Sequence, residues 1–205
     1  MIPGEPSPAA GKPLRADARR NRALVLETAE AVFAAKGISA STEEIARRAG
    51  VGVGTVFRHF PTKEALLEAI IIGRLRRLAG EADSLAAADD PGAAFFAFFT
   101  QAVGQSATKI AFVDALAGAG VDVDNAISQV GQDLHRALDR LLARAQHAGA
   151  VRDDVGVTEV IALLAGISRA AEQAAWDDTT TTRTLTIVFD GLRHVAGKPS
   201  GSASP

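Results

Sequence analysis

The stretch of residues 41–63, STEEIARRAGVGVGTVFRHFPTK, restricts the fold more than any other part of the chain, because it contains two short helix patterns separated by a glycine. Ser41 stands three residues before Glu44, which is the spacing of a capping box, where each side chain binds a free amide at the helix start. Gly50 then provides the left-handed residue that commonly follows a helix. The pattern predicts a helix that begins after Ser41 and ends before Gly50.

A second short helix is expected from about Gly52 to Phe60. Val56 and Phe60 are four residues apart and would both face the core. Pro61 prevents an easy continuation, and Thr62 can cap the helix that follows. A helix-turn-helix is the economical interpretation, and its second helix is the candidate DNA reader.

The charge of the chain is unevenly distributed along its 205 residues. The formal net charge is −2, yet residues 1–80 carry 13 Lys and Arg against 8 Asp and Glu, and residues 81–205 carry 9 against 16. A basic first part and an acidic remainder suit a nucleic-acid reader joined to a domain with another task. The alternative is an uneven surface charge without functional meaning.

The chain contains no cysteine, which excludes disulfides, thiolate metal sites and cysteine nucleophiles. Its beginning, rich in Pro and Ala, has neither the basic nor the apolar region of a signal peptide. No apolar run approaches the ~18 residues of a membrane span. We expect a soluble, cytoplasmic protein.

Apolar residues recur at helical spacing through the rest of the chain, and no strand-like alternation persists. Further helices are expected over residues 14–36, 63–88, from Pro91 onward, 108–117, from Asp122 or Asp124 to 147, 158–176 and 180–195. We predict an all-α fold with four parts: a disordered tail over residues 1–13, a helix-turn-helix domain over 14–62, a larger helical domain over 63–196 and a disordered tail over 197–205.

The run TEEIARRAGVGVGTVFRHFPTKEALLEAI, after a helix that ends AEAVFAAKG, resembles the TetR family of transcriptional regulators. The matching features are Ile-Ala and Ala-Gly-Val, Gly-Thr before an aromatic residue, His-Phe, and Lys-Glu-x-Leu-Leu. The resemblance covers about 55 residues. It implies an N-terminal DNA-binding domain of three helices and a C-terminal helical domain for effector binding and dimerisation.

Proteins of this type bind operator DNA as homodimers and place the third helix of each subunit in the major groove. The resemblance implies these DNA-binding candidates: Ser41, Thr42, Gly52, Val53, Gly54, Thr55, Phe57, Arg58, His59 and Lys63. Arg58 suits either a guanine or a phosphate, and Thr55 offers a hydroxyl or a methyl group. His59 and Lys63 suit phosphate.

Two positions depart from the family pattern. The family commonly has tyrosine at the position of Phe57, where the hydroxyl reaches a phosphate, and many relatives have a polar residue at the position of Val53. Phenylalanine keeps the aromatic contact and loses the hydrogen bond. We therefore expect few direct base contacts, from Arg58 and Thr55, together with readout of groove shape.

Four phenylalanines fall within five positions of the helix after Pro91, and they cannot all face one side. Each one alone is best explained by core packing. As a group, with the family's effector site in view, they suggest an apolar pocket with a few polar groups. The ligand-binding candidates are Phe95, Phe96, Phe99, Gln101, Phe112 and Trp176.

The last two helices resemble the pair that builds the family's dimer interface. Small residues spaced by four would permit close approach of helices related by a two-fold axis, although packing within one subunit is the alternative. The interface candidates are Ile161, Gly166, Ala170, Ala174, Phe189 and Leu192.

Two pairs at i,i+4 spacing, His135 with Asp139 and Asp190 with His194, raise the question of acid–base chemistry or metal binding. No third ligand or nucleophile stands at a recognisable spacing, so we predict no catalytic residue, no metal and no cofactor. The expected function is a homodimeric DNA-binding regulator, a repressor that a largely apolar small-molecule effector releases from its operator. The alternative is a helical small-molecule-binding or enzymatic protein with an incidental helix-turn-helix.

Overall fold

The computed structural model describes residues 11–104 and 124–194, and these residues form eight helices and no strand. Apart from one isolated bridge between Val151 and Arg193, the described chain is helical or in turns, which confirms the all-α prediction. The helices are α1 (Gly11–Lys36), α2 (Thr42–Ala49), α3 (Val53–His59), α4 (Lys63–Leu85), α5 (Pro91–Gly104), α7 (Asp124–His147), α8 (Val157–Gln173) and α9 (Asp178–Leu192). The helix expected over residues 108–117 lies outside the described residues. Within the described ranges, no helix has both the length and the apolar character needed to cross a bilayer.

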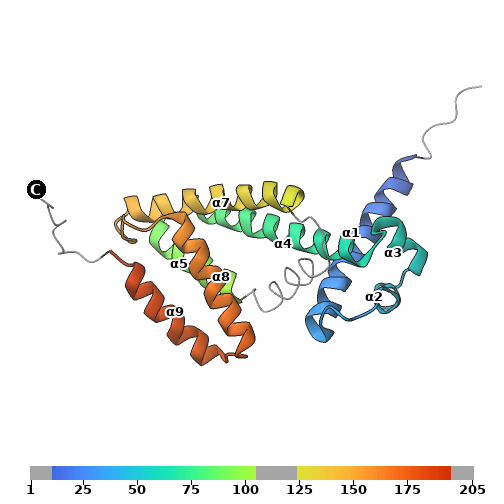
Figure 1. The fold of residues 1–205 in the computed structure, drawn as a ribbon. Coiled ribbons are helices and arrows are strands. Elements are labelled where there is room, and N and C mark those ends of the chain that lie inside the picture. The colour runs from blue at the N-terminus through green and yellow to red at the C-terminus, as the bar shows by residue number, and fades with distance from the viewer. Residues whose placement is uncertain (1–10, 105–123, 195–205) are drawn as a thin grey trace, which may run out of the picture.

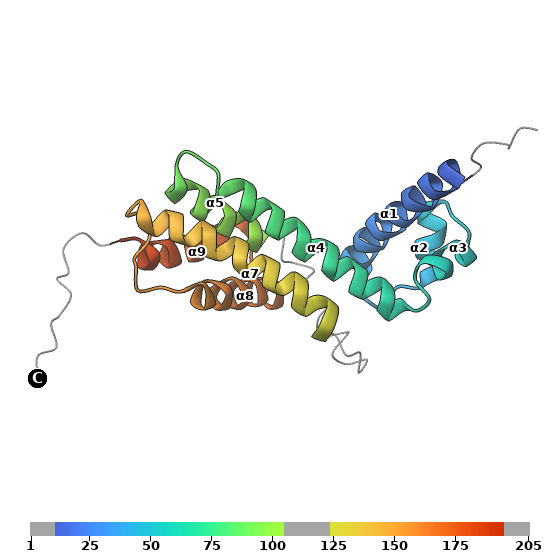
Figure 2. The same ribbon diagram turned by 90° about the horizontal axis from the view of Figure 1, so that it is seen from above.

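The molecule has two bodies joined by α4. Figures 1 and 2 show α1, α2 and α3 at one end, α5, α7, α8 and α9 at the other, and α4 running from one into the other. Each body has its own core. In the first core, Leu66, Leu67, Ile70 and Ile71 of α4 pack with α1–α3. In the larger body, which contains α5, α7, α8 and α9, the α4 residues Leu78, Ala79 and Ala82 pack into the second core. The boundary expected between residues 62 and 63 therefore falls at the start of a helix that both bodies share.

Capping residues start α2, α4 and α5 where the sequence predicted them. The Glu44 amide donates to Ser41 Oγ at 3.2 Å, and the Ala65 amide donates to Thr62 Oγ1 at 3.1 Å. The Ala93 amide donates to the carboxylate of Asp90 at 2.9 Å, at the start of α5. Because such bonds satisfy amides that have no partner inside the helix, they define where a helix begins.

Two local expectations are wrong. Helix α1 begins at Gly11, so residues 11–13 are helical and not part of a disordered tail. Pro13 lies in the first turn, where proline is tolerated because its missing amide has no helical partner. The capping box at α2 is only half formed, since the Glu44 carboxylate turns instead to Lys36 Nζ at 2.5 Å.

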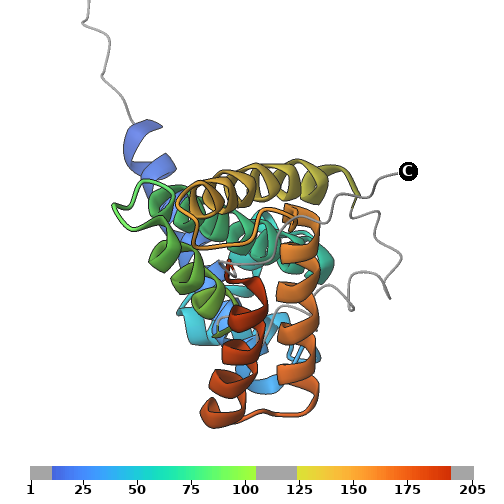
Figure 3. The same cartoon turned by 90° about the vertical axis from the view of Figure 1, so that its left-hand side faces the viewer.

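The larger body is built around α4 and α7, which lie side by side along most of their length (Figures 1 and 2). Helix α5 packs against both, and α8 contacts α5 and α7. Figure 3 shows α8 and α9 side by side at the front of this body, on the side turned away from α1–α3. Their outer faces are thus turned away from the body that α1–α3 form.

Candidate DNA-binding face and effector domain

Helix α3 is anchored to its domain by one side only. Val56 and Phe60 are buried in the first core, as the sequence predicted. Gly50 has φ of 66° and ends α2 in the left-handed region, where glycine has no steric cost. This tight turn and the buried anchors present the other side of α3 to solvent.

The exposed side of α3 carries most of the predicted DNA-binding residues. Val53 and Phe57 are 37% and 42% exposed, which is unusual for large apolar side chains and leaves them one turn apart on the open face. Thr55 and His59 are half-buried. The further exposed members of the predicted set are Gly52, Gly54 and Arg58.

The remaining predicted contacts flank α3. Ser41 is exposed at the N-cap of α2, and Thr42 is half-buried at its first position. Lys63 is the first residue of α4, and its ammonium lies 5.7 Å from the centre of the Phe33 ring. That cation–π contact holds the lysine at the helix start that follows the reading helix.

The two arginines of α2 are tied to the protein and not simply solvated. Arg48 lies 3.2 Å and Arg47 3.9 Å from the same Glu44 carboxylate oxygen that binds Lys36. The hydrogen bond from Lys36 is the main cause that lowers the pKa of Glu44, and the charges of Lys36 and the two arginines add to it. This cluster fixes the start of α2 against the end of α1.

Comparison with known proteins agrees with this geometry over both bodies. Residues 25–70 match the family described as bacterial regulatory proteins of the tetR family, and residues 90–194 match the C-terminal domain of SbtR-like transcriptional regulators. A TetR transcription regulatory protein from Mycobacterium vanbaalenii is 45% identical, covers 88% of this chain and 99% of its own, and superposes with a TM-score of 0.72. The chain belongs to the TetR family.

Other TetR-family proteins give the same picture. The regulator SCO0520 from Streptomyces coelicolor is 34% identical over 85% of this chain and 99% of its own, with a TM-score of 0.70. The HTH-type transcriptional regulator SrpR from Pseudomonas putida is 40% identical over 60 residues, which are 29% of this chain and 28% of that protein. The latter match therefore supports the family and not a shared effector.

The phenylalanine cluster of this TetR-family chain is mostly core. Phe95 and Phe99 are fully buried, and Phe96 and Phe99 pack against Phe189 with ring centres 4.8 and 5.6 Å apart. Trp176 is half-buried against the same core. Phe112 lies outside the described residues. The packing explains these aromatic residues without a ligand.

Gln101, one of the predicted effector residues, lines an open pocket of about 470 Å³ between α4 and α5. Glu81 lines it too, and one of its carboxylate oxygens is buried without a hydrogen-bond partner among the described residues. Sequence reasoning missed Glu81, because a glutamate within an amphipathic helix has no distinguishing pattern. Its neighbours in the pocket lining are Arg77, Gly80, Ser84 and Leu85.

The predicted dimer residues divide into two groups. Gly166 on α8 and Ala174, which caps the C-terminal end of α8, are exposed, and Ile161 and Ala170 on α8 are half-buried. Phe189 and Leu192 instead pack into the subunit core. Ile187 on α9 is 74% exposed, more than any other large apolar side chain described, and was not predicted.

The two histidine–aspartate pairs form no site. His135 and Asp139 are both exposed on α7. The carboxylate of Asp190 binds Arg193 at 2.5 Å and not His194. In the described ranges no three residues among His, Asp and Glu gather in a way that could hold a metal ion.

Proposed function

We propose that the chain is a homodimeric transcriptional repressor that binds operator DNA through α3 and leaves it when a small molecule enters the larger body. The observation that carries the proposal is the one-sided anchoring of α3. Buried Val56 and Phe60 hold the helix, while Val53, Phe57 and Arg58 stand free on its outer side. An exposed helix after a glycine turn is the geometry that enters a major groove. Operator DNA lies in the cytoplasm, which is where we expect the protein to act.

The residues of the reading face take different roles. Arg58 is the candidate for bidentate contact with a guanine or a phosphate, and Thr55 offers a hydroxyl to a base. His59 and Lys63 contact phosphates, together with Ser41 and Thr42 at the start of α2. Phosphate contacts add affinity and register, whereas base contacts add sequence preference.

Two reading helices are needed for an operator with two half-sites, so the chain acts as a dimer. We place at the two-fold interface Gly166 and Ala170 on α8, Ala174 at its C-terminal cap, and Ile187 on α9. A Cβ added at Gly166 meets nothing within 4 Å among the described residues, so this face of α8 has space for a partner helix. Half-sites about one helical turn apart, roughly 34–36 Å, would match the paired helices.

Effector release follows from the position of α4, which contributes to both cores. A molecule that binds one arrangement of the larger body more tightly shifts the population of subunit pairs toward it. If that arrangement spaces the two α3 helices wrongly, operator affinity falls. A tenfold fall requires about 1.4 kcal/mol of differential binding.

Selection of genomic DNA fragments by the purified protein tests the proposal. At low salt and without effector, we expect enrichment of a palindromic sequence with half-sites one helical turn apart. Failure to enrich any palindrome would contradict the proposal. It would favour a helical small-molecule-binding protein.

A further inference from the structure

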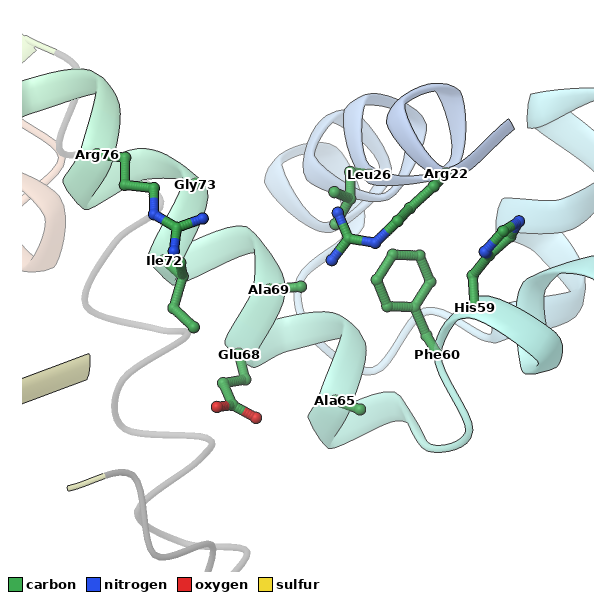
Figure 4. A pocket seen from close by; sticks show the side chains of 10 residues that line it. All are labelled: Arg22, Leu26, His59, Phe60, Ala65, Glu68, Ala69, Ile72, Gly73 and Arg76. Atoms are coloured by element: carbon green, nitrogen blue, oxygen red, sulfur yellow. The ribbon is translucent and has the colours of Figure 1, made fainter. Parts of the chain in front are cut away.

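A second pocket lies away from the effector domain, where α1, the end of α3 and the first half of α4 meet (Figure 4). Its volume is about 390 Å³, which is enough for a small organic molecule. His59 and Phe60 come from the end of α3, Arg22 and Leu26 from α1, and the other lining residues from α4. The pocket therefore touches the reading helix directly.

The wall of this pocket combines polar and apolar groups in about equal parts. Leu26, Phe60, Ala69 and Ile72 line it, and in Figure 4 the Phe60 ring stands between α1 and α4. The Phe60 side chain is itself buried, and Leu26 and Ala69 are half-buried against the first core. These apolar side chains favour a ligand with an apolar body, since burial of apolar groups away from water is favourable.

The charges around the pocket favour an anion. The Arg22 guanidinium lies 5.0 Å from the centre of the Phe60 ring, and Arg76 lines the far end. Neither arginine forms an ion pair with a carboxylate among the described residues. Glu68 is the one acidic residue in the lining, and Figure 4 shows its carboxylate pointing away from Arg22. Two arginines without an ion pair among the described residues, beside the apolar side chains of the lining, complement a molecule with an apolar body and one negative head.

We propose that this pocket binds a small amphipathic anion, such as an aryl-alkyl carboxylate, and that its occupation weakens DNA binding. The effect on DNA binding rests on the proposed function. His59 lines the pocket and belongs to the proposed DNA-binding face. A negative charge held here repels nearby phosphates, because charges within the Debye length of about 8–10 Å are only partly screened. The site is separate from the pocket that Gln101 and Glu81 line.

Isothermal titration of the full chain with three compounds tests the site. The probes 4-phenylbutyrate, 4-phenylbutylamine and 4-phenyl-1-butanol share one apolar body and differ in the head group. We expect the carboxylate to bind at least tenfold more tightly than the other two. Equal affinities, or no binding of the carboxylate, would overturn the proposal.

Substitutions in the two pockets show which of them binds the carboxylate. Arg76→Glu, at an exposed position, is expected to reduce carboxylate affinity at least tenfold, and Ala69→Phe to block the pocket. Arg136→Gln is the control, since it removes an exposed arginine of α7 that pairs only with Asp133 on its own helix. Gln101→Ala tests the other pocket. If Gln101→Ala abolished binding and Arg76→Glu did not, the carboxylate would occupy the other pocket and the proposal would be wrong.

The effect on DNA is measured separately with a selected operator fragment. We expect 4-phenylbutyrate to raise the Kd of the wild-type protein for DNA. The Kd of the Arg76→Glu variant for DNA should be the same with and without 4-phenylbutyrate. An unchanged wild-type Kd at saturating carboxylate would overturn the coupling. If the protein bound no DNA at all, the proposed function would fail, while the titration would still decide whether the site exists.

Discussion

Glu30 on α1 forms ion pairs with Arg74 and Arg77 of α4. Arg74 Nε lies 2.6 Å from one carboxylate oxygen of Glu30, and Arg77 Nη2 lies 3.0 Å from both oxygens. The Arg74 side chain is 10% exposed and that of Glu30 26%, so the contact is largely shielded from water. It joins the first helix of the DNA-binding domain to α4 just where α4 leaves the first core.

Glu30→Gln should weaken this junction. Charge-assisted, partly buried hydrogen bonds contribute about 1.5–3 kcal/mol, and the substitution removes the negative charge that Arg74 and Arg77 contact, so we expect the free energy of unfolding to fall by about 1–2 kcal/mol. Chemical denaturation measures this change. Glu27→Gln is the matched control, because Glu27 is an exposed glutamate of the same helix. Equal stability of the two variants would show that the junction contributes nothing.

The exposed pair Val53 and Phe57 should read thymine methyl groups. Apolar side chains on a reading helix have no hydrogen bond to offer, and the C5 methyl of thymine is the apolar group in the major groove. Replacing an operator thymine that faces them by deoxyuridine should cost about 0.8 kcal/mol, or about fourfold in affinity. Val53→Ala should lose this sensitivity. The idea is wrong if no thymine position responds to the exchange.

Lys63→Ala should weaken binding to all DNA sequences alike. A lysine that neutralises one phosphate contributes about one unit to the slope of log affinity against log salt, and the variant should lose that unit. Fluorescence anisotropy over a salt series measures the slope, and Lys63→Arg should keep it. A change in base preference in the alanine variant would disprove the phosphate role.

Substitutions on α8 and α9 test the dimer. Gly166→Leu adds a bulky side chain at an exposed position where a Cβ meets nothing within 4 Å, and Ile187→Asp places a charge on an exposed position, so both should separate the subunits without loss of helicity. Analytical ultracentrifugation at nanomolar to micromolar concentrations measures this. Leu24→Asp, at an exposed apolar position on α1, should leave the dimer intact. Variants of Gly166 and Ile187 that remain dimeric at nanomolar concentration would move the interface elsewhere.

The contribution of the Lys36–Glu44 ion pair to stability should depend on pH. Because the pKa of Glu44 is lowered from its ordinary value of 4.5, chiefly by the Lys36 hydrogen bond, the folded state favours the ionised carboxylate. Its contribution to stability is complete above that ordinary value and is lost as the pH falls through the lowered pKa. Wild type should therefore exceed Lys36→Met in stability at neutral pH, with a difference that shrinks in acid. A difference independent of pH would exclude this ion pair as its source.

Local signals in the sequence predicted the helices and the exposed face of α3 that we propose to read DNA. Caps such as Ser41 and Asp90 act within three residues, so the chain displays them directly. Contacts between distant residues were not visible, such as Glu30 with Arg74, or Phe189 with Phe96. Helical spacing indicates which residues share a face but not which neighbour covers it.

Ile187 illustrates this limit. It stands next to the apolar stripe of α9, and spacing alone does not tell whether a neighbouring helix covers it. The structure leaves it exposed and buries Leu192, which the sequence had placed at the dimer interface. The pocket between α1 and α4 was equally hidden, since three separate segments build it.

Whether α3 reads DNA is tested most directly by the ratio of the affinity for specific DNA to the affinity for non-specific DNA. Wild type and Arg58→Ala should be compared on the selected operator and on a scrambled duplex at one salt concentration. We predict that Arg58→Ala lowers the ratio roughly 5- to 150-fold, which corresponds to about 1–3 kcal/mol of binding free energy. Its affinity for the scrambled duplex should change little. If single substitutions at Arg58, Thr55 and Val53 all left the ratio unchanged, α3 would not be the reading helix.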